Sequence, residues 1–312
     1  MVMLIVIKKT MRRPPMQLID FIITVFCKID DMLKNIFKNN RLRQRGPQPK
    51  LSDSETITME IVGEFLGKDC DEDIHAYFKT HWSNLFPRIP ERSVFVRQSA
   101  NLWAVKQKLR QQFLATLFSE NAGLRIIDGL PMPVGNFRRA YFSKNFKGTA
   151  AYGYCASKNL TYYGLKGHLL IDPSGVIVDM TVTAANVDER EAFFDLAHQV
   201  PFKALGDKGY ILRKTHKQDL QRIGVELETP LRDNMRETRP PQYVRLLNKT
   251  RRIIETVIGQ LTERLNIEKI RAKDLWHLTM RIGRKLLSHT VAHCIARSQG
   301  ITGLRFDDLI SI

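Results

Sequence analysis

Hydrophobic positions near the amino terminus recur at steps of three and four residues. They are Leu18, Ile22, Val25, Ile29, Met32 and Ile36. Because that spacing places all six side chains on one face of a helix, it predicts an amphipathic helix over residues 16–37. Residues 1–15 precede this helix and contain a break at Pro14 and Pro15, so we interpret them as a possible extension that arises from the choice of start site.

Three more helices are predicted before the middle of the chain. Ser52 and Glu55 have the spacing of a capping box, which predicts the start of the second helix. The periodicity then predicts helices over residues 73–82 and 93–118. Residues 16–118 are therefore expected to form a small all-helical domain that binds DNA ends.

Short apolar runs bounded by glycine follow in the middle of the chain. Residues 124–129 (LRIIDG) and 202–210 (FKALGDKGY) have this character, and each contains an aspartate, Asp128 or Asp207. Strands that are buried in a parallel or mixed sheet show short apolar runs of this kind. We therefore expect an α/β fold with Asp128 at the end of one strand and Asp207 near the end of another.

A helical pattern returns in the sequence RRIIETVIGQL. The apolar residues of this helix are Ile254, Ile258, Leu261 and Leu265. Glu255 borders their stripe, and Gly259 leaves space one turn further along. The simpler interpretation of each acid by itself is structural, because an Asp before a Gly is common in turns and a Glu on an amphipathic helix is usually solvated.

The net charge of the chain indicates which class of partner it binds. Forty-nine Lys and Arg against 32 Asp and Glu leave a net charge of +17, as expected for a protein that neutralises phosphates. A ribosomal protein or a membrane-surface binder would share this excess, so its distribution matters more. Residues 129–171 contain no acid, and their cations are interleaved with aromatic residues, which predicts a basic loop that holds DNA.

Several cations are candidate DNA contacts in this region and beside the acids. They are Arg138, Arg139, Lys144, Lys147, Lys158, Lys166, Lys208 and Arg251. On the predicted fourth helix, Arg97, Gln98 and Asn101 have side chains able to read base edges. Residues 232–252 form a second basic stretch, which we interpret as a flexible connection into the helix of Glu255.

The sequence contains no motif for a zinc site, a nucleotide-binding loop or a membrane span. The four cysteines form no CxxC pair and have no zinc spacing, and there is no glycine-rich phosphate loop. The apolar run at residues 1–7 is far shorter than a membrane span and lacks the preceding basic residues of a secretory signal. We therefore expect a cytoplasmic protein that binds no ATP.

The three acids together suit metal-dependent phosphodiester chemistry. Mg²⁺ prefers oxygen ligands, and a two-metal site needs carboxylates from several elements aimed at one point. The carboxyl ends of neighbouring strands meet at one edge of a sheet, where a helix can lean over them. Asp128, Asp207 and Glu255 are thus candidates for one shared site.

The order and context of these acids resemble the DDE transposases of bacterial insertion sequences. The segments that carry the resemblance are IID, GDKGY and RRIIETVIGQL, with GLKGHLLIDPSG and TAANVDER between them. In related families an Arg lies one turn before the Glu, and Arg251 matches it. The Tyr and the basic residue that accompany that Arg are replaced by Asn248 and Thr262.

The resemblance implies a fold and a function. The fold is an RNase H-like catalytic domain over residues 119–298, with a mixed five-stranded sheet flanked by helices, followed by a tail over residues 299–312. It implies that Asp128, Asp207 and Glu255 are catalytic and bind two Mg²⁺ ions, for which Mn²⁺ can substitute. The partners would be double-stranded DNA, as terminal inverted repeats and target, and further copies of the chain in a homodimer or larger multimer, in the bacterial cytoplasm at the nucleoid.

Two rival functions stay open from the sequence. An RNase H-like nuclease would use the same three acids to cut DNA without joining it. A DNA-binding protein derived from a transposase would use the basic surface alone. Strand-transfer products separate the first rival from a transposase, and the intact set of acids argues against the second.

Overall fold

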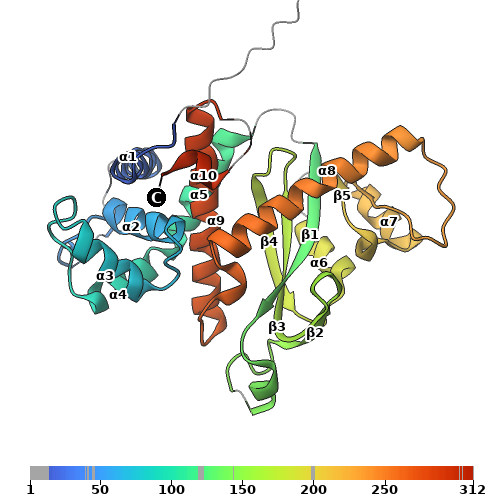
Figure 1. Ribbon diagram of the computed structural model, residues 1–312, viewed down its shortest axis with the longest axis horizontal. Helices are drawn as coiled ribbons and strands as arrows, with labels where there is room; N and C mark the ends of the chain where they lie inside the picture. The colour runs from blue at the N-terminus through green and yellow to red at the C-terminus, as the bar shows by residue number, and fades with distance from the viewer. Residues whose placement is uncertain are drawn as a thin grey trace, which may run out of the picture.

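The chain folds into a cluster of helices that lies beside a mixed sheet with its own helices (Figure 1). The computed structural model describes residues 14–311 except 39, 41, 44, 45, 119–122, 143, 198–200, 302 and 304. The extension predicted for residues 1–15 therefore lies outside the described residues, apart from Pro14 and Pro15. No helix in the described part of the chain is both long and apolar enough to cross a membrane.

Five helices make up the amino-terminal part. They are α1 (Leu18–Phe37), α2 (Asp53–Phe65), α3 (Asp71–His81), α4 (Arg92–Asn101) and α5 (Trp103–Leu117). The predicted helix over residues 93–118 is two helices, because the buried residue Leu102 has a ψ angle of 7° and turns the chain between α4 and α5. The turn lets α4 pack on α2 and α3 while α5 packs on a later helix.

The predicted face of the first helix and the predicted start of the second are confirmed. The face of α1 that carries Ile22, Val25 and Ile29 is buried. At the start of α2, the Ser52 side chain accepts a hydrogen bond of 3.1 Å from the Glu55 backbone N–H, and Glu55 Oε2 accepts one of 2.6 Å from the Ser52 N–H. This capping box satisfies two backbone donors that the helix itself leaves open.

The sheet is mixed, as predicted, and its arrangement is consistent with an RNase H-like fold. Its strands are β1 (Leu124–Pro133), β2 (Ala151–Cys155), β3 (Leu160–Ile171), β4 (Ile177–Ala184), β5 (Phe202–Leu205) and β6 (Val225–Glu228). The order is β2-β3-β1-β5-β6, with β4 also on β3. β1 is antiparallel to β3 and parallel to β5, and β5 is parallel to β6.

The sheet has six strands instead of the expected five, and neither β2 nor β6 was predicted by its residues. The residues of β2 pair with Leu160 to Gly164 of β3, whereas β4 pairs with Leu165 to Ile171. The two strands thus follow one another along the same edge of β3. The alternation of exposed Tyr152 and Tyr154 with less exposed neighbours fits a strand with one solvated face, a pattern masked by the polar composition around it.

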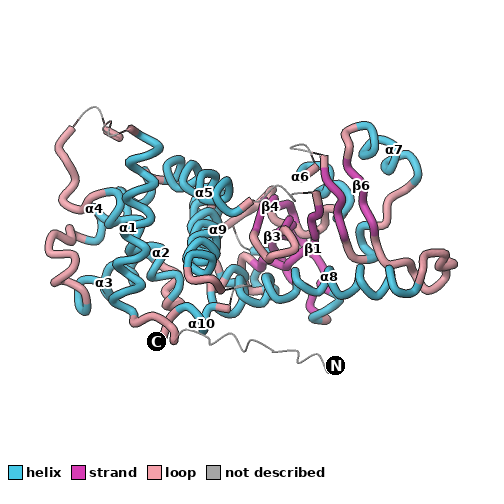
Figure 2. The backbone as a smooth tube through the Cα atoms, turned by 90° about the horizontal axis from the view of Figure 1, so that it is seen from above, coloured by secondary structure: helices cyan, strands magenta, loops and turns pink. Residues whose placement is uncertain are grey.

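Helices cover both faces of the sheet. They are α6 (Glu189–Leu196), α7 (Lys214–Arg222) and α8 (Pro241–Gly259). Figure 2 shows α8 along one side of the strands and α6 and α7 along the other. Successive residues of a strand point to opposite faces, so Ile126 joins the core that includes Ile254 of α8, and Ile127 joins the core that includes Phe193 of α6.

The end of the chain returns to the amino-terminal helices. α9 (Leu275–Ser298) packs on α5 and α2, and α10 (Phe306–Leu309) follows it. The ring of Phe306 lies 5.1 Å from that of Phe65, and the Met16 N–H donates a hydrogen bond of 3.0 Å to the Leu309 carbonyl. The segment predicted as a tail is therefore packed on the helical part over its described residues.

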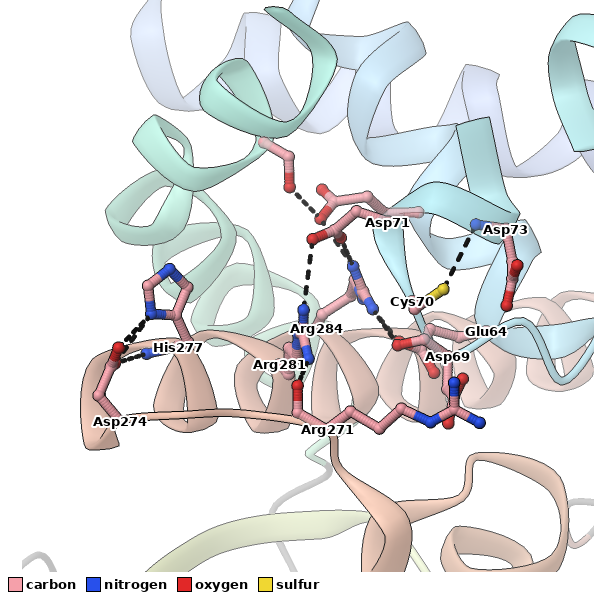
Figure 3. Close-up of polar contacts among 12 residues, drawn as sticks. Glu64, Asp69, Cys70, Asp71, Asp73, Arg271, Asp274, His277, Arg281 and Arg284 are labelled. Carbon is pink, nitrogen blue, oxygen red and sulfur yellow. Dashed lines mark hydrogen bonds and ion pairs between the residues drawn. The ribbon is translucent and has the colours of Figure 1, made fainter. Parts of the chain in front are cut away.

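A buried network of charges joins α2, α3 and α9 (Figure 3). Glu64 accepts hydrogen bonds of 2.6 Å from Arg284 Nε and 2.7 Å from Lys285 Nζ, and Arg284 also donates one of 2.5 Å to Asp71. Burial alone would lower the pKa of Arg284, but the neighbouring carboxylates raise it above its usual value. Each charge in this network therefore depends on its partners to offset its loss of water.

Candidate functional site

Asp128 lies within β1, and not at its end as predicted. β1 continues to Pro133 because the residues after Asp128 pair with β3, from Gly129 opposite His168 to Pro133 opposite Gly164. The Asp128 side chain is 22% exposed, and its Oδ1 accepts a hydrogen bond of 2.8 Å from the Gly129 N–H. The carboxylate is thus held against its own strand.

Asp207 follows β5, the parallel neighbour of β1. Ile126 of β1 is paired with Leu205 of β5, so the two aspartates each lie two residues beyond a paired position. Asp207 caps a short 3-10 helix (Lys208–Tyr210), and its Oδ1 accepts a hydrogen bond of 2.8 Å from the Gly209 N–H. Parallel pairing therefore brings the two predicted acids to the same level of the sheet.

Glu255 approaches from α8 and is linked to Asp128 by Arg251. Arg251 lies one turn earlier on α8, with one terminal nitrogen 4.0 Å from Asp128 Oδ2 and the other 3.2 Å from Glu255 Oε1. The Glu255 side chain is 55% exposed. Of the predicted stripe, Ile254, Leu261 and Leu265 are fully buried and Ile258 is partly buried, but α8 ends at Gly259, before the last two. Glu255 lies at the solvent boundary.

A fourth carboxylate, Glu189, lies between the two aspartate segments and was not predicted as a site residue. A Cβ added at Gly209 would meet Glu189 Oε2 at 2.0 Å, and one added at Gly129 would meet Oε1 at 3.6 Å. Glu189 is the first residue of α6, after the N-cap Asp188. Its signal in the sequence was the TAANVDER segment, in which an acid directly follows an N-capping Asp and so opens a helix.

Burial and neighbouring carboxylates raise the pKa values of Asp128 and Glu189. Burial first, and then the charges of Asp207 and Glu189, raise the pKa of Asp128 to about 7. Burial also raises the pKa of Glu189, opposed by Lys166 and reinforced by Asp207. The site therefore carries negative charge that its cations do not balance. An all-oxygen donor set with uncompensated charge fits a hard divalent cation such as Mg²⁺.

The acids share this region without forming a tight cluster. Among the described residues, the one group of three acids, His or Cys whose ligand atoms all lie within 4.8 Å of each other is Asp69, Cys70 and Asp73, at the start of α3. There the Cys70 sulfur accepts a hydrogen bond from the Asp73 N–H as a helix cap. Asp128, Asp207 and Glu255 lie further apart, as expected of side chains that repel one another.

His168 and Tyr210 form a buried support beneath the aspartates. His168 is fully buried opposite Gly129, and its ring nitrogens lie 3.4 Å from the Tyr210 hydroxyl and 3.0 Å from Thr183 Oγ1. Burial, with a smaller contribution from Lys166, lowers the pKa of His168 to about 4. The imidazole is therefore neutral near pH 7, and its contacts are with Tyr210 and Thr183 inside the fold.

A cavity of about 640 Å³ opens beside Asp207. Its walls include Asn248 and Arg251 of α8 and residues 230–233 of the loop before it. Arg239 closes that loop with hydrogen bonds to the Thr229 carbonyl. Of the connection predicted to be flexible over residues 232–252, only residues 232–240 are irregular, because α8 begins at Pro241. The buried Nε of Arg251 has no hydrogen-bond partner among the described residues, which leaves a donor for a ligand at this wall.

The predicted basic loop is more ordered than expected. It contains a 3-10 helix (Phe137–Phe142) and β2, and Lys166 lies inside β3. Four of the predicted DNA contacts are exposed on this segment between β1 and β2: Arg138, Arg139, Lys144 and Lys147. The rings of Tyr141 and Phe142 beside them are 84% and 81% exposed. We call this surface, residues 137–147 without 143, the basic-aromatic tip.

Three other predicted DNA contacts are engaged in ion pairs. Lys158 pairs with Glu268 at 2.5 Å, and Lys208 pairs with Asp233 at 2.9 Å, although both lysines remain exposed. Lys166 is mostly buried, and its Nζ lies 3.5 Å from Glu189 Oε1. Lys166 therefore faces the acids of the site.

The prediction that Gln98 contacts DNA is wrong. Its side chain is buried and donates hydrogen bonds of 3.0 Å to the Leu51 carbonyl and to Asp53 Oδ1. It thus fixes α4 to the start of α2, and neighbouring residues on a helix need not share an environment. Arg97 and Asn101, on the same helix, are exposed.

Comparison with known proteins gives one match. The model of a family described as the transposase DDE domain matches residues 118–275, about half of the chain. No curated protein and no solved structure matches the chain. The matched segment begins just before β1 and ends at the start of α9, so it contains every acid of the site described above.

Proposed function

Because the chain belongs to the family of DDE transposases, we propose that it cuts DNA at the ends of an insertion sequence and joins the freed 3′ hydroxyl to target DNA. The observation that carries this proposal is that Asp128 and Asp207 each lie two residues beyond Ile126 and Leu205, the last paired positions of the parallel strands β1 and β5, while Arg251 links Glu255 to Asp128. These acids bear the charge that phosphodiester chemistry requires of a metal site.

Asp128, Asp207 and Glu255 are the residues that would hold two Mg²⁺ ions, for which Mn²⁺ can substitute. When bound, such ions activate an attacking water or hydroxyl and stabilise the leaving oxygen. Asp128 must first lose its proton, and its raised pKa places that loss near neutral pH. Arg251 holds Glu255 in a position from which it reaches toward the strand acids.

The same residues would serve both reactions, because cleavage and joining are both in-line displacements at phosphorus, with water as the nucleophile in cleavage and the freed 3′ hydroxyl in joining. Two element ends must meet before joining, so we propose a homodimer or larger multimer on DNA. The partners are double-stranded terminal repeats and target DNA, and the place of action is the cytoplasm of a bacterial cell, at the nucleoid.

The direct test is cleavage and strand transfer on DNA that carries the element's ends. We expect joined products in the presence of Mg²⁺, none with EDTA, and none from Glu255→Gln, because the variant loses a charged ligand without a change in size. Glu263→Gln is the matched control, because Glu263 is an exposed residue of the short π-helix (Gln260–Arg264) that follows α8. Metal-dependent cutting without joining would favour a nuclease instead, and binding without any cutting would overturn the catalytic assignment.

The basic-aromatic tip is expected to contact DNA phosphates. Substituting both Arg138 and Arg139 by Ala should reduce the slope of log affinity against log salt by about 2, because each phosphate contact accounts for roughly 0.9 of that slope. Fluorescence anisotropy on one DNA duplex over a series of salt concentrations measures this slope.

The control for that experiment removes two exposed cations elsewhere. Lys214→Ala with Lys217→Ala, on α7, makes the same change in net charge. A slope that falls equally in both double variants would show that only the total charge matters, and the tip would then have no special contact with DNA.

A further inference from the structure

Glu189 is placed against the two segments that carry the aspartates. Its two carboxylate oxygens lie against different segments, Oε1 above Gly129 next to Asp128, and Oε2 above Gly209, whose N–H is bonded to Asp207. Both glycines lack the side chain that would otherwise fill this space. The gap between the aspartate segments is therefore occupied by a carboxylate group.

Glu189 reaches this position from a rigid element. It begins α6, where Asp188 accepts a hydrogen bond of 2.9 Å from the Arg190 N–H and so fixes the first turn. The adjoining residues Ala192 and Phe193 are fully buried against the sheet. The carboxylate is thus presented by a packed helix, in contrast to Glu255, which is more than half exposed.

Lys166 is the cation that faces Glu189. Its Nζ lies 3.5 Å from Glu189 Oε1 and 3.5 Å from the Val187 carbonyl, and its side chain is 17% exposed. An ion pair of this length is loose, since charge-assisted hydrogen bonds are usually 2.7 to 2.9 Å long. Lys166 contacts Oε1, whereas Oε2 lies against Gly209 on the side of Asp207 Oδ1.

The local charge count favours a further cation. The described carboxylates at this place are Asp128, Asp207, Glu189 and Glu255, and the cations paired with them are Lys166 and Arg251. Repulsion between close carboxylates is costly where solvent is reduced. A bound divalent cation near the aspartates would offset the charge of Glu189 as well as theirs.

We propose that Glu189 is a further ligand of the metal site, held by Lys166 before the metal binds and shared with it afterwards. The inference rests on the proposed function, because it assumes that Asp128 and Asp207 bind the ion. The residues that would hold the cation are then Asp128 of β1, Asp207 after β5, Glu189 of α6 and Glu255 of α8.

Mn²⁺ binding without DNA tests this proposal independently of catalysis. In calorimetric titrations at pH 8, we expect Glu189→Gln to weaken Mn²⁺ binding at least tenfold. Glu191→Gln, an exposed position on the same helix, should leave it unchanged. Lys166→Met should tighten Mn²⁺ binding several-fold in the wild-type background, because it removes the cation that competes for Glu189, and this gain should disappear in combination with Glu189→Gln.

The outcomes separate this proposal from the function on which it rests. If Asp207→Asn loses Mn²⁺ affinity while Glu189→Gln binds within twofold of the wild type, Glu189 is not a ligand and the transposase function stands. If the wild-type protein binds no Mn²⁺, both are overturned. The Lys166→Met variant still contains Glu189. If Lys166→Met also tightens Mn²⁺ binding when Glu189 is replaced by Gln, Glu189 is not the residue through which Lys166 acts, and the proposal is overturned.

Discussion

Replacing Asp128 by Asn is expected to stabilise the metal-free protein and, at the same time, to abolish DNA cleavage. The carboxylate has a pKa of about 7 in the fold against 3.8 ordinarily, because burial and the charges of Asp207 and Glu189 disfavour its ionised form. Asparagine keeps an oxygen for the Gly129 N–H and removes the charge. It cannot bind a cation as a carboxylate does, so we expect cleavage to fall about a thousandfold or more, roughly 4 kcal/mol.

The gain in stability depends on pH in a defined direction. Below pH 3.8 the carboxyl is protonated in both folded and unfolded chains, so it carries no penalty. As pH rises toward 7 the unfolded chain releases its proton while the folded chain retains it, and the folded state is progressively disfavoured. Above pH 7 the penalty is constant at roughly 4 kcal/mol, from 1.36 kcal/mol per pKa unit. The advantage of Asp128→Asn should therefore be largest at pH 8 and fall to roughly 1.5 kcal/mol at pH 5.

Urea unfolding at pH 5 and pH 8, with EDTA present, measures this advantage. Asp195→Asn, an exposed position on α6, is the matched control and should change the free energy of unfolding by less than about 0.5 kcal/mol at either pH. Addition of Mg²⁺ should stabilise the wild type and leave Asp128→Asn unaffected. An Asp128→Asn protein that is less stable than the wild type at pH 8 would contradict the raised pKa.

Replacing Glu64 by Ala is expected to lower the free energy of unfolding by about 3 to 5 kcal/mol. The Glu64 side chain is 1% exposed and accepts hydrogen bonds from Arg284 and Lys285. Its removal leaves the buried Lys285 without this ion pair and Arg284 with Asp71 as its main partner. The loss of one partner of a buried pair costs far more than the pair contributes. Because Glu64 is on α2 and the cations are on α9, the loss also loosens the contact between the amino-terminal helices and α9.

Urea unfolding monitored by circular dichroism gives the size of this effect. Glu72→Ala is a suitable control, since Glu72 is 69% exposed and pairs with Arg92 at the surface. Exposed pairs contribute about 0 to 1 kcal/mol, so we expect the control to change little. A Glu64→Ala protein that loses less than about 1 kcal/mol would show that Arg284 and Lys285 find other partners or water.

Local patterns were sufficient for much of the fold. The period of apolar residues predicted α1, and Ser52 with Glu55 predicted the start of α2, because helix faces and caps depend on residues only a few positions apart. The apolar run before Asp128 predicted a buried strand for the same reason. The strand β2 was missed because the residues of β2 alone do not have a clear strand pattern. Its pairing with Leu160–Gly164 of β3 forms the strand.

Neighbours that lie far apart in sequence account for what was missed. Gln98 was expected at a DNA surface, but it is buried by α2, whose Asp53 and Leu51 accept its hydrogen bonds. Glu189 was not expected in the site, because only the folding of α6 against the sheet brings it above Gly129 and Gly209. Burial and hydrogen-bond partners are properties of the packed structure.

The sequence by itself determined which residues could do the chemistry. The order of Asp128, Asp207 and Glu255, the excess of cations and the resemblance of three short segments were enough to predict a DDE transposase domain, and the family match confirms it. Only the tertiary structure decided that Asp128 titrates near pH 7, that Lys166 faces the acids, and that Glu189 stands between the aspartates. The physical reason is that charge interactions depend on distance and on exclusion of water, and both are set by strand pairing and helix packing.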